Sequence, residues 1–264
     1  SIWMACRYVP VTSPGGAAAD RNGARLDWLG LLLGAAGTLC LLNGMVELHG
    51  SDTAQAVVLL VAAALIFTGF IWWQRHQSAN GGAPLMNMAL FGFRPFAMGS
   101  MVAFIYGTAL FGSTYLLPVY MQLGLNLSAS YVGTILLPAG FVLAFTIAGV
   151  GRLADKQPTW LLVGIGLGLL TASFALMTTI TLTSGLWILV VLSIIGRGGL
   201  GFILPSLNLG SLRPLHESLL SQGSSAISFV RMLGGAIGVS LCGIVLEWRL
   251  SVHGDTLVNP VSSP

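Results

Sequence analysis

Two arginines inside long apolar stretches are the most chemically demanding residues of this sequence. Arg197 lies in "LSIIGRGGLGFILPS", far from any other charge, and Arg231 lies in "SFVRMLGGAIG". An arginine at the centre of a membrane helix costs about 2.5 to 3.5 kcal/mol, so it should face protein or water. Two interpretations stay open for Arg197: a functional charge inside the apolar stretch, or a structural arginine bound by backbone carbonyls beside Gly198 and Gly199. Arg231 is close enough to a loop for its side chain to extend toward the membrane surface.

A second charged group is the short turn "GRLADKQPTW", which places Gly151, Arg152, Asp155 and Lys156 between two apolar stretches. The simplest interpretation is a cytoplasmic anchor, because basic residues accumulate in the loops on that side.

No metal, cofactor or covalent chemistry is predicted. The three cysteines (Cys6, Cys40, Cys242) and four histidines (His49, His76, His216, His253) are scattered, without the spacing of a metal site or disulfide framework. No nucleophile and base pair stands out, so an enzyme is not expected. The calculated isoelectric point near 9.0 reflects loop anchors and requires no nucleic acid.

The elements that carry these residues must be membrane helices. Of 264 residues, 55% are hydrophobic and 7% are charged, and the mean hydropathy is +0.87. A soluble domain has about 25% charged residues. The outer surface should therefore contact a lipid bilayer, which is the first expected partner.

The apolar stretches predict seven membrane crossings, because a helix needs roughly 20 apolar residues to cross. Continuous runs of Leu, Ala, Gly and Met, without polar alternation, favour helices over a barrel. The fold class is thus an all-α integral membrane protein.

Lys and Arg alternate between loops and so predict the orientation. Eight of the eleven basic residues fall on one side and only Arg249 on the other; the eight are Arg7, Arg21, Arg25, Arg75, Arg94, Arg152, Lys156 and Arg213. Residue 1 should therefore lie on the cytoplasmic side of the cell (inner) membrane.

Several motifs, in order, resemble the fourteen-helix drug:proton antiporters of the major facilitator superfamily. The charged turn resembles that family's cytoplasmic-loop signature, although Pro158, Thr159 and Trp160 replace its later residues. Other segments that resemble the family are "RLDWLGLLLGAAG" (25–37), "APLMNMALFGFRPFAMGS" (83–100), "YLLPVYMQLGLNLSASYVGTILLPAG" (115–140), "IIGRGGLGF" (194–202) and "SFVRMLGGAIGVSLCG" (228–243).

The resemblance implies a division of the chain into a cytoplasmic lead-in (1–26), an additional transmembrane helix pair (27–75), a cytoplasmic loop (76–95), five helices of the C-terminal transporter half (96–248) and an extracytoplasmic tail (249–264). Seven helices are half of the family's fourteen. The sequence is therefore expected to be a C-terminal half fragment that needs a missing N-terminal half and a final helix.

The same resemblance implies roles for particular residues. Gly151, Arg152, Asp155 and Lys156 would form a conformational latch, and Arg197 with Gly201 would correspond to an arginine motif that is tied to proton transfer in the first half. Gly234, Gly235 and Gly238 have the spacing of close helix packing, and packing alone is the other interpretation. The candidates for a substrate cavity are Tyr106, Thr108, Ser113 and Tyr115 on the third crossing.

The predicted function is proton-coupled efflux of amphipathic or cationic small molecules. All eight acids lie at helix ends or in loops, so the residue that carries protons is expected in the missing half. The alternative is a non-transporting membrane scaffold or truncated remnant.

Overall fold

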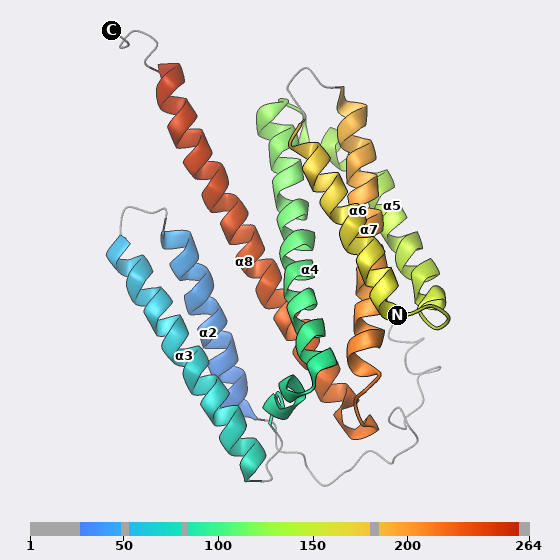
Figure 1. The fold of residues 1–264 in the computed structure, drawn as a ribbon. Helices are drawn as coiled ribbons and strands as arrows, with labels where there is room; N and C mark the ends of the chain where they lie inside the picture. Colours follow the sequence, from blue (N-terminus) through green and yellow to red (C-terminus); the bar gives the residue numbers. More distant parts are fainter. Residues whose placement is uncertain (1–26, 49–52, 81–83, 180–184, 259–264) are drawn as a thin grey trace, which may run out of the picture.

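The computed structural model describes residues 27–48, 53–80, 84–179 and 185–258 (Figure 1). Over these ranges the long elements are all α-helices, as the sequence predicts. They are α2 (Trp28–Glu47), α3 (Thr53–Ala79), α4 (Arg94–Val119), α5 (Ala129–Leu153), α6 (Thr159–Met177), α7 (Leu186–Leu212) and α8 (Glu217–Val258), with a short 3₁₀ helix η1 (Met88–Gly92) and a π-helical turn η2 (Tyr120–Gly124).

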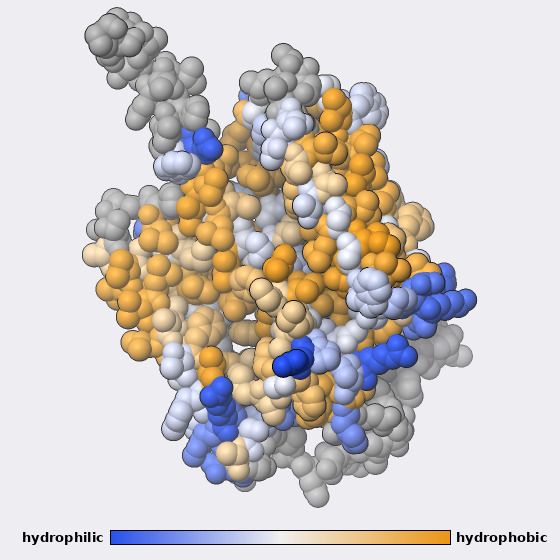
Figure 2. Space-filling view, in the orientation of Figure 1, coloured by the Kyte–Doolittle hydropathy of each residue, from blue (hydrophilic) through white to orange (hydrophobic). Residues whose placement is uncertain are grey.

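Seven of these helices are long and apolar enough to cross a membrane, which confirms the predicted number. Hydrophobic residues cover the middle of the face seen in Figure 2, and polar residues gather toward its lower end. This distribution suits a bilayer, where lipid surrounds the middle of the molecule and the ends meet water.

The helix α7 lies at the centre of the larger group of helices. Half of its membrane span is buried, whereas at most 28% of any other described span is buried. It contacts α4, α5 and α6, while α8 packs along α4. The hairpin of α2 and α3 stands apart from this group and reaches it chiefly through α2 and α8 (Figure 1).

Glycines bring α4 and α8 into backbone contact. A Cβ atom added at Gly234 would overlap the carbonyl group of Phe104, and one added at Gly107 would overlap the carbonyl oxygen of Arg231. Thr108 Oγ1 donates a hydrogen bond to the Gly234 carbonyl oxygen at 2.9 Å. Lipid gives little hydrophobic drive for helices to associate, so membrane helices depend on close packing. Small residues such as these glycines allow the two backbones to approach closely.

A second glycine contact joins α6 to α7. A Cβ at Gly166 would lie 2.7 Å from the Gly199 carbonyl oxygen, and a Cβ at Gly199 would lie 2.7 Å from the Gly166 carbonyl oxygen. The Ser173 hydroxyl of α6 also donates to the Leu192 carbonyl oxygen of α7 at 2.7 Å. The pair is therefore held by backbone proximity and by one buried hydrogen bond.

Two helices extend beyond the bounds expected from the sequence. α3 continues to Ala79, past residue 75, and α8 continues to Val258, past residue 248. In α3 the imidazole ring of His76 stacks on the indole ring of Trp72, with centroids 5.4 Å apart. Polar residues can continue a membrane helix into the interface, where their side chains reach water. The expected lead-in 1–26 and the last part of the expected tail 249–264, residues 259–264, lie outside the described residues.

A buried carboxylate fastens the helix hairpin to the segment that precedes η1. Asp27 caps α2 by accepting a hydrogen bond from the Gly30 amide at 2.8 Å. It also accepts from Trp73 Nε1 at 2.9 Å and from Gln74 Nε2 at 2.8 Å, both on α3. Gln74 is fully buried, and its Oε1 accepts from the Met86 amide at 3.2 Å. This Asp27 cluster joins three segments that are distant in sequence.

The Asp27 carboxyl is held in its ionised form. Burial raises its pKa, but hydrogen bonds from Trp73, Gly30 and Gln74 outweigh burial and keep the pKa below its ordinary value of 3.8. A carboxyl with a depressed pKa in the folded state stabilises the fold above the unfolded value, and that contribution is lost as the pH falls through the folded value.

We predict that Asp27→Asn lowers the free energy of unfolding by about 1 to 3 kcal/mol, because an amide nitrogen would then face the Gln74 donor. Thermal unfolding of the purified chain in detergent, followed from neutral pH to about pH 3, measures both effects. The wild-type advantage should shrink below the ordinary pKa of 3.8. Glu47→Gln, at the opposite end of α2, is the matched control. Equal stability of Asp27→Asn and wild type at neutral pH would contradict the prediction.

Candidate functional site

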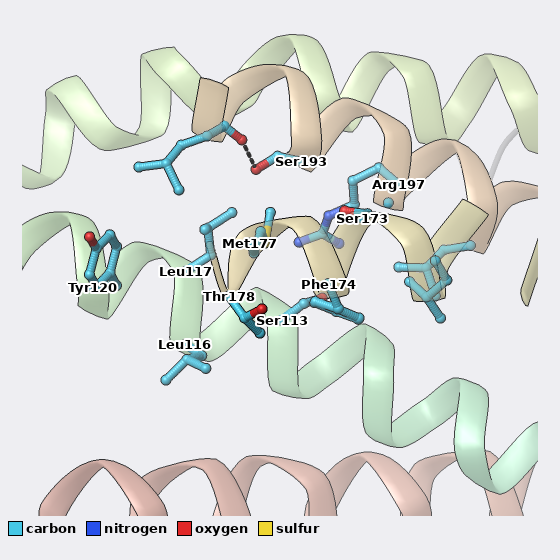
Figure 3. Close-up of a pocket in the computed structure, with 14 residues that line it drawn as sticks. Ser113, Leu116, Leu117, Tyr120, Ser173, Phe174, Met177, Thr178, Ser193 and Arg197 are labelled. Carbon is cyan, nitrogen blue, oxygen red and sulfur yellow. Dashed lines mark hydrogen bonds between the residues drawn. The ribbon is translucent and has the colours of Figure 1, made fainter. Parts of the chain in front are cut away.

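A cavity of about 410 Å³ lies between the C-terminal ends of α4 and α6 and the first half of α7 (Figure 3). Its wall is mainly apolar, with a few hydroxyl groups and one charged side chain. The described lining residues are Ser113, Leu116, Leu117, Tyr120, Leu170, Ser173, Phe174, Met177, Thr178, Leu189, Ser193, Gly196, Arg197 and Leu200. Apolar walls with a few polar groups are typical of small-molecule sites.

Arg197 is the charged residue of the cavity, and α7 places it near the middle of its span. Its Nη2 donates a hydrogen bond to Thr114 Oγ1 on α4 at 2.9 Å. The expected structural alternative was a set of backbone carbonyls beside Gly198 and Gly199, but the hydrogen bond shown by the structure goes to a hydroxyl on another helix. The guanidinium thus faces α4 across the cavity.

Four hydroxyls of the lining are already committed as donors. Ser193 donates to the Leu189 carbonyl oxygen at 2.7 Å, the bond dashed in Figure 3. Ser173 bonds across to α7 as described above. Ser113 and Thr178 donate to carbonyl oxygens one turn earlier in their own helices, at 3.0 and 2.7 Å. A hydroxyl has one proton to donate, so these groups can offer a ligand only their oxygen lone pairs.

The four residues expected to form a substrate cavity are not brought together. Ser113 lines the cavity. Tyr106 is 1% exposed and belongs to the hydrophobic core. Thr108 bonds to Gly234 in the contact of α4 with α8. Tyr115 lies on the α8 side of α4, with its hydroxyl 3.9 Å from the Cβ position of Gly243.

The remaining candidates lie at helix contacts. Gly234, Gly235 and Gly238 all face α4, where added Cβ atoms would meet Phe104, Phe111 and Thr108. Gly201 faces Thr146 on α5. Arg231 lies on α8, where its backbone carbonyl faces Gly107 of α4.

The charged turn joins α5 to α6 and is open to solvent. Arg152 is in the last turn of α5, and Gly151, Arg152, Asp155 and Lys156 are all exposed. Between them Ala154 is buried against Val150 and Leu162, so the turn is anchored by its apolar residue. Its charges remain available to another surface.

Sequence reasoning missed Asp27, Gln74 and most of the cavity wall. The usable signal was the pair Trp73 and Gln74, since a glutamine in an otherwise apolar span needs a buried partner. The cavity wall carried no comparable signal, because its leucines and serines resemble those of any membrane helix.

The fold defines a multi-pass α-helical membrane protein with a cavity among its helices. Among known protein families, the sequence model of the family described as Major Facilitator Superfamily matches residues 54–239 of this chain. The chain belongs to this superfamily, which confirms the superfamily indicated by its motifs.

Similar curated proteins cover most of the chain. It is 26% identical to the lincomycin resistance protein LmrB of Bacillus subtilis over 89% of this chain and 49% of the relative. It is 27% identical to the multidrug resistance protein B homolog of Mycobacterium tuberculosis over 91% of this chain and 44% of the relative. The MFS-type transporter YhcA of Bacillus subtilis is 25% identical over 90% of this chain and 44% of the relative. The chain spans less than half the length of each.

Proposed function

We propose that this chain forms the second-half portion of a proton-coupled multidrug efflux transporter of the cell membrane. The observation that carries the proposal is the apolar cavity between α4, α6 and α7 with Arg197 in its wall. Relatives named for lincomycin and multidrug resistance support the substrate class, since their similarity runs along most of this chain. Residue 1 is proposed to face the cytoplasm, from the distribution of basic residues.

The proposed mechanism needs a second set of helices. Alternating access requires one bundle to rock against another around a central site. Of the described acids, Asp27 and Glu47 lie at the ends of α2, Asp155 in the turn after α5 and Glu217 at the start of α8. Glu247 and Asp255 do not lie at a helix end or in a loop as expected, because α8 continues to Val258. Glu247 is close to the end of the α8 membrane span at Arg249 and Asp255 lies beyond it, so the proton carrier is assigned to the partner half. In this proposal, Asp155 and its basic neighbours form a latch with that half on the cytoplasmic side.

The alternative function is a membrane scaffold that does not transport. The observation that favours it is the extent of apolar surface, since only 11% of the α5 span is buried. Large exposed apolar faces also serve as contacts between membrane proteins.

Efflux from inverted membrane vesicles under a proton gradient distinguishes the two functions. The chain is tested alone and joined to the first half of the Bacillus subtilis lincomycin resistance relative, with a cationic, a neutral and an anionic amphipathic dye. Gradient-dependent movement of any of the three dyes in the joined form supports a transporter. Correct insertion without movement of any dye would favour the scaffold.

We predict that Asp155→Asn in the joined form slows efflux roughly tenfold, a typical size for a coupling between two states. The exposed carboxylate should contribute to the latch and little to folding. Gln157→Asn is the control, because it alters a neighbouring exposed side chain without changing charge. A rate unchanged by Asp155→Asn would leave the turn as an anchor only.

A further inference from the structure

The polar side chains of the cavity wall carry a net positive charge, and they differ in how many hydrogen bonds they can donate to a ligand. Arg197 carries a positive charge, and none of the described lining residues is acidic. A cation that entered the cavity would approach a guanidinium without a carboxylate to offset it. Charges interact strongly away from water, so this arrangement disfavours a cation.

The donors that remain in the wall also favour an anion. The hydroxyl protons of Ser113, Ser173, Thr178 and Ser193 are bonded to backbone carbonyls. A guanidinium has five N–H donors, and its bond to Thr114 uses one. Tyr120 also lines the cavity and brings one phenolic O–H donor. Arg197 therefore offers a ligand more hydrogen bonds than any other lining side chain, and a carboxylate can accept two of them side by side.

The rest of the wall suits a hydrocarbon chain or an aromatic body. Leu116, Leu117, Phe174, Met177 and Leu200 contribute apolar surface around the polar group (Figure 3). Arg197 is half-buried, and an arginine withdrawn from water is stabilised when an anion compensates its charge. The ligand that satisfies both features has an acidic head and an apolar body.

We infer that the cavity between α4, α6 and α7 binds an amphipathic anion, with its acidic group on Arg197 and its apolar part against α4 and α6. The family resemblance implied amphipathic or cationic small molecules, and this inference keeps the amphipathic character but assigns a negative charge. The inference rests on the proposed function only for the statement that such an anion is transported. Binding can be measured without transport, so a failure of the inferred binding and a failure of the proposed transport are distinguishable.

The experiment measures binding of cis-parinaric acid, a fluorescent long-chain carboxylate, to the full chain in nanodiscs of zwitterionic lipid. Its methyl ester and a long-chain alkylammonium serve as the neutral and cationic competitors, and empty nanodiscs give the background. We expect saturable binding that the cation does not displace. Arg197→Gln should weaken it by roughly ten- to a hundredfold, the value of a charged hydrogen bond, and Arg197→Lys should weaken it less.

Arg213→Gln is the matched control, because this exposed arginine lies at the other end of α7. It should leave binding unchanged, and thermal unfolding of each variant reports whether the fold is retained. Repeating the titration in nanodiscs with phosphatidylglycerol distinguishes a free carboxylate from an anionic lipid. Arg197-dependent competition by the lipid supports the same head-group chemistry with a lipid as its source.

Three results would overturn the inference. The first is equal binding of the acid and its ester to the wild-type chain. The second is an Arg197→Gln variant that stays folded and binds the acid as wild type does. The third is the absence of saturable binding in both lipid compositions.

Discussion

Gly234→Ala is expected to separate α4 from α8, although it adds only one methyl group. The new Cβ would overlap the backbone carbonyl of Phe104, and a backbone atom cannot rotate away as a side chain can. The helices would have to move apart, and the hydrogen bond from Thr108 to Gly234 would be stretched. We expect the free energy of unfolding to fall by about 3 kcal/mol or more.

Thermal unfolding in detergent measures the loss, and hydrogen exchange should rise in α4 and α8 first. Gly243→Ala is the matched control on the same helix, because its added Cβ would meet the Tyr115 hydroxyl at an ordinary 3.9 Å. The free energy of unfolding of that control should be within about 1 kcal/mol of the wild-type value, since alanine has a higher helix propensity than glycine. Similar losses in both variants would show that the close contact is not the cause.

Gly199→Ala should release α6 from α7 and remove the cavity with it. Its Cβ would lie 2.7 Å from the Gly166 carbonyl oxygen and 3.0 Å from the Leu170 amide nitrogen. α6 supplies Leu170, Ser173 and Phe174 to the cavity wall, so displacement of α6 opens the site. We expect a loss of about 3 kcal/mol in unfolding free energy together with faster amide exchange in α6.

The neighbouring Gly198→Ala provides the control for this second prediction. Its Cβ would meet Val142 at 3.9 Å, an ordinary contact. Exchange in α6 should then match wild type. If Gly199→Ala leaves α6 as protected as in wild type, the approach of the two backbones does not hold the pair together.

The number and type of membrane elements followed from composition because a bilayer allows few solutions. Backbone groups in lipid must be satisfied internally, so long apolar stretches become helices. The seven predicted crossings match the helices that the structure describes as long and apolar enough. The exposed charges of the turn at Asp155 also agree with its predicted place between two crossings.

Which face of each helix contacts protein could not be predicted in the same way. Lipid tails and neighbouring helices are both apolar, so hydropathy does not distinguish them. Thr108 and Ser113 lie on the same crossing and looked equivalent in sequence. The structure commits Thr108 to the carbonyl of Gly234 on α8 and places Ser113 in the cavity wall.

The hydrogen-bond partner of Arg197 could not be predicted from the sequence either. The free-energy cost of an arginine inside a membrane predicts that its side chain has a partner. Sequence supplied only nearby groups as candidates, whereas Thr114 Oγ1 is separated from it by 83 positions. Asp27 and Gln74, 47 positions apart, escaped prediction for this reason too.

The Asp27 cluster also bears on the order in which the helices can insert into the membrane during synthesis. Asp27 leaves the ribosome before its partners, since Trp73 and Gln74 follow by 46 and 47 positions and Leu85 by 58. Until they arrive, the carboxylate has to stay hydrated at the membrane surface, because an unpaired charge is costly to bury. α2 is therefore expected to reach its final depth only after α3 has emerged, so that nascent α2 and α3 insert as a pair.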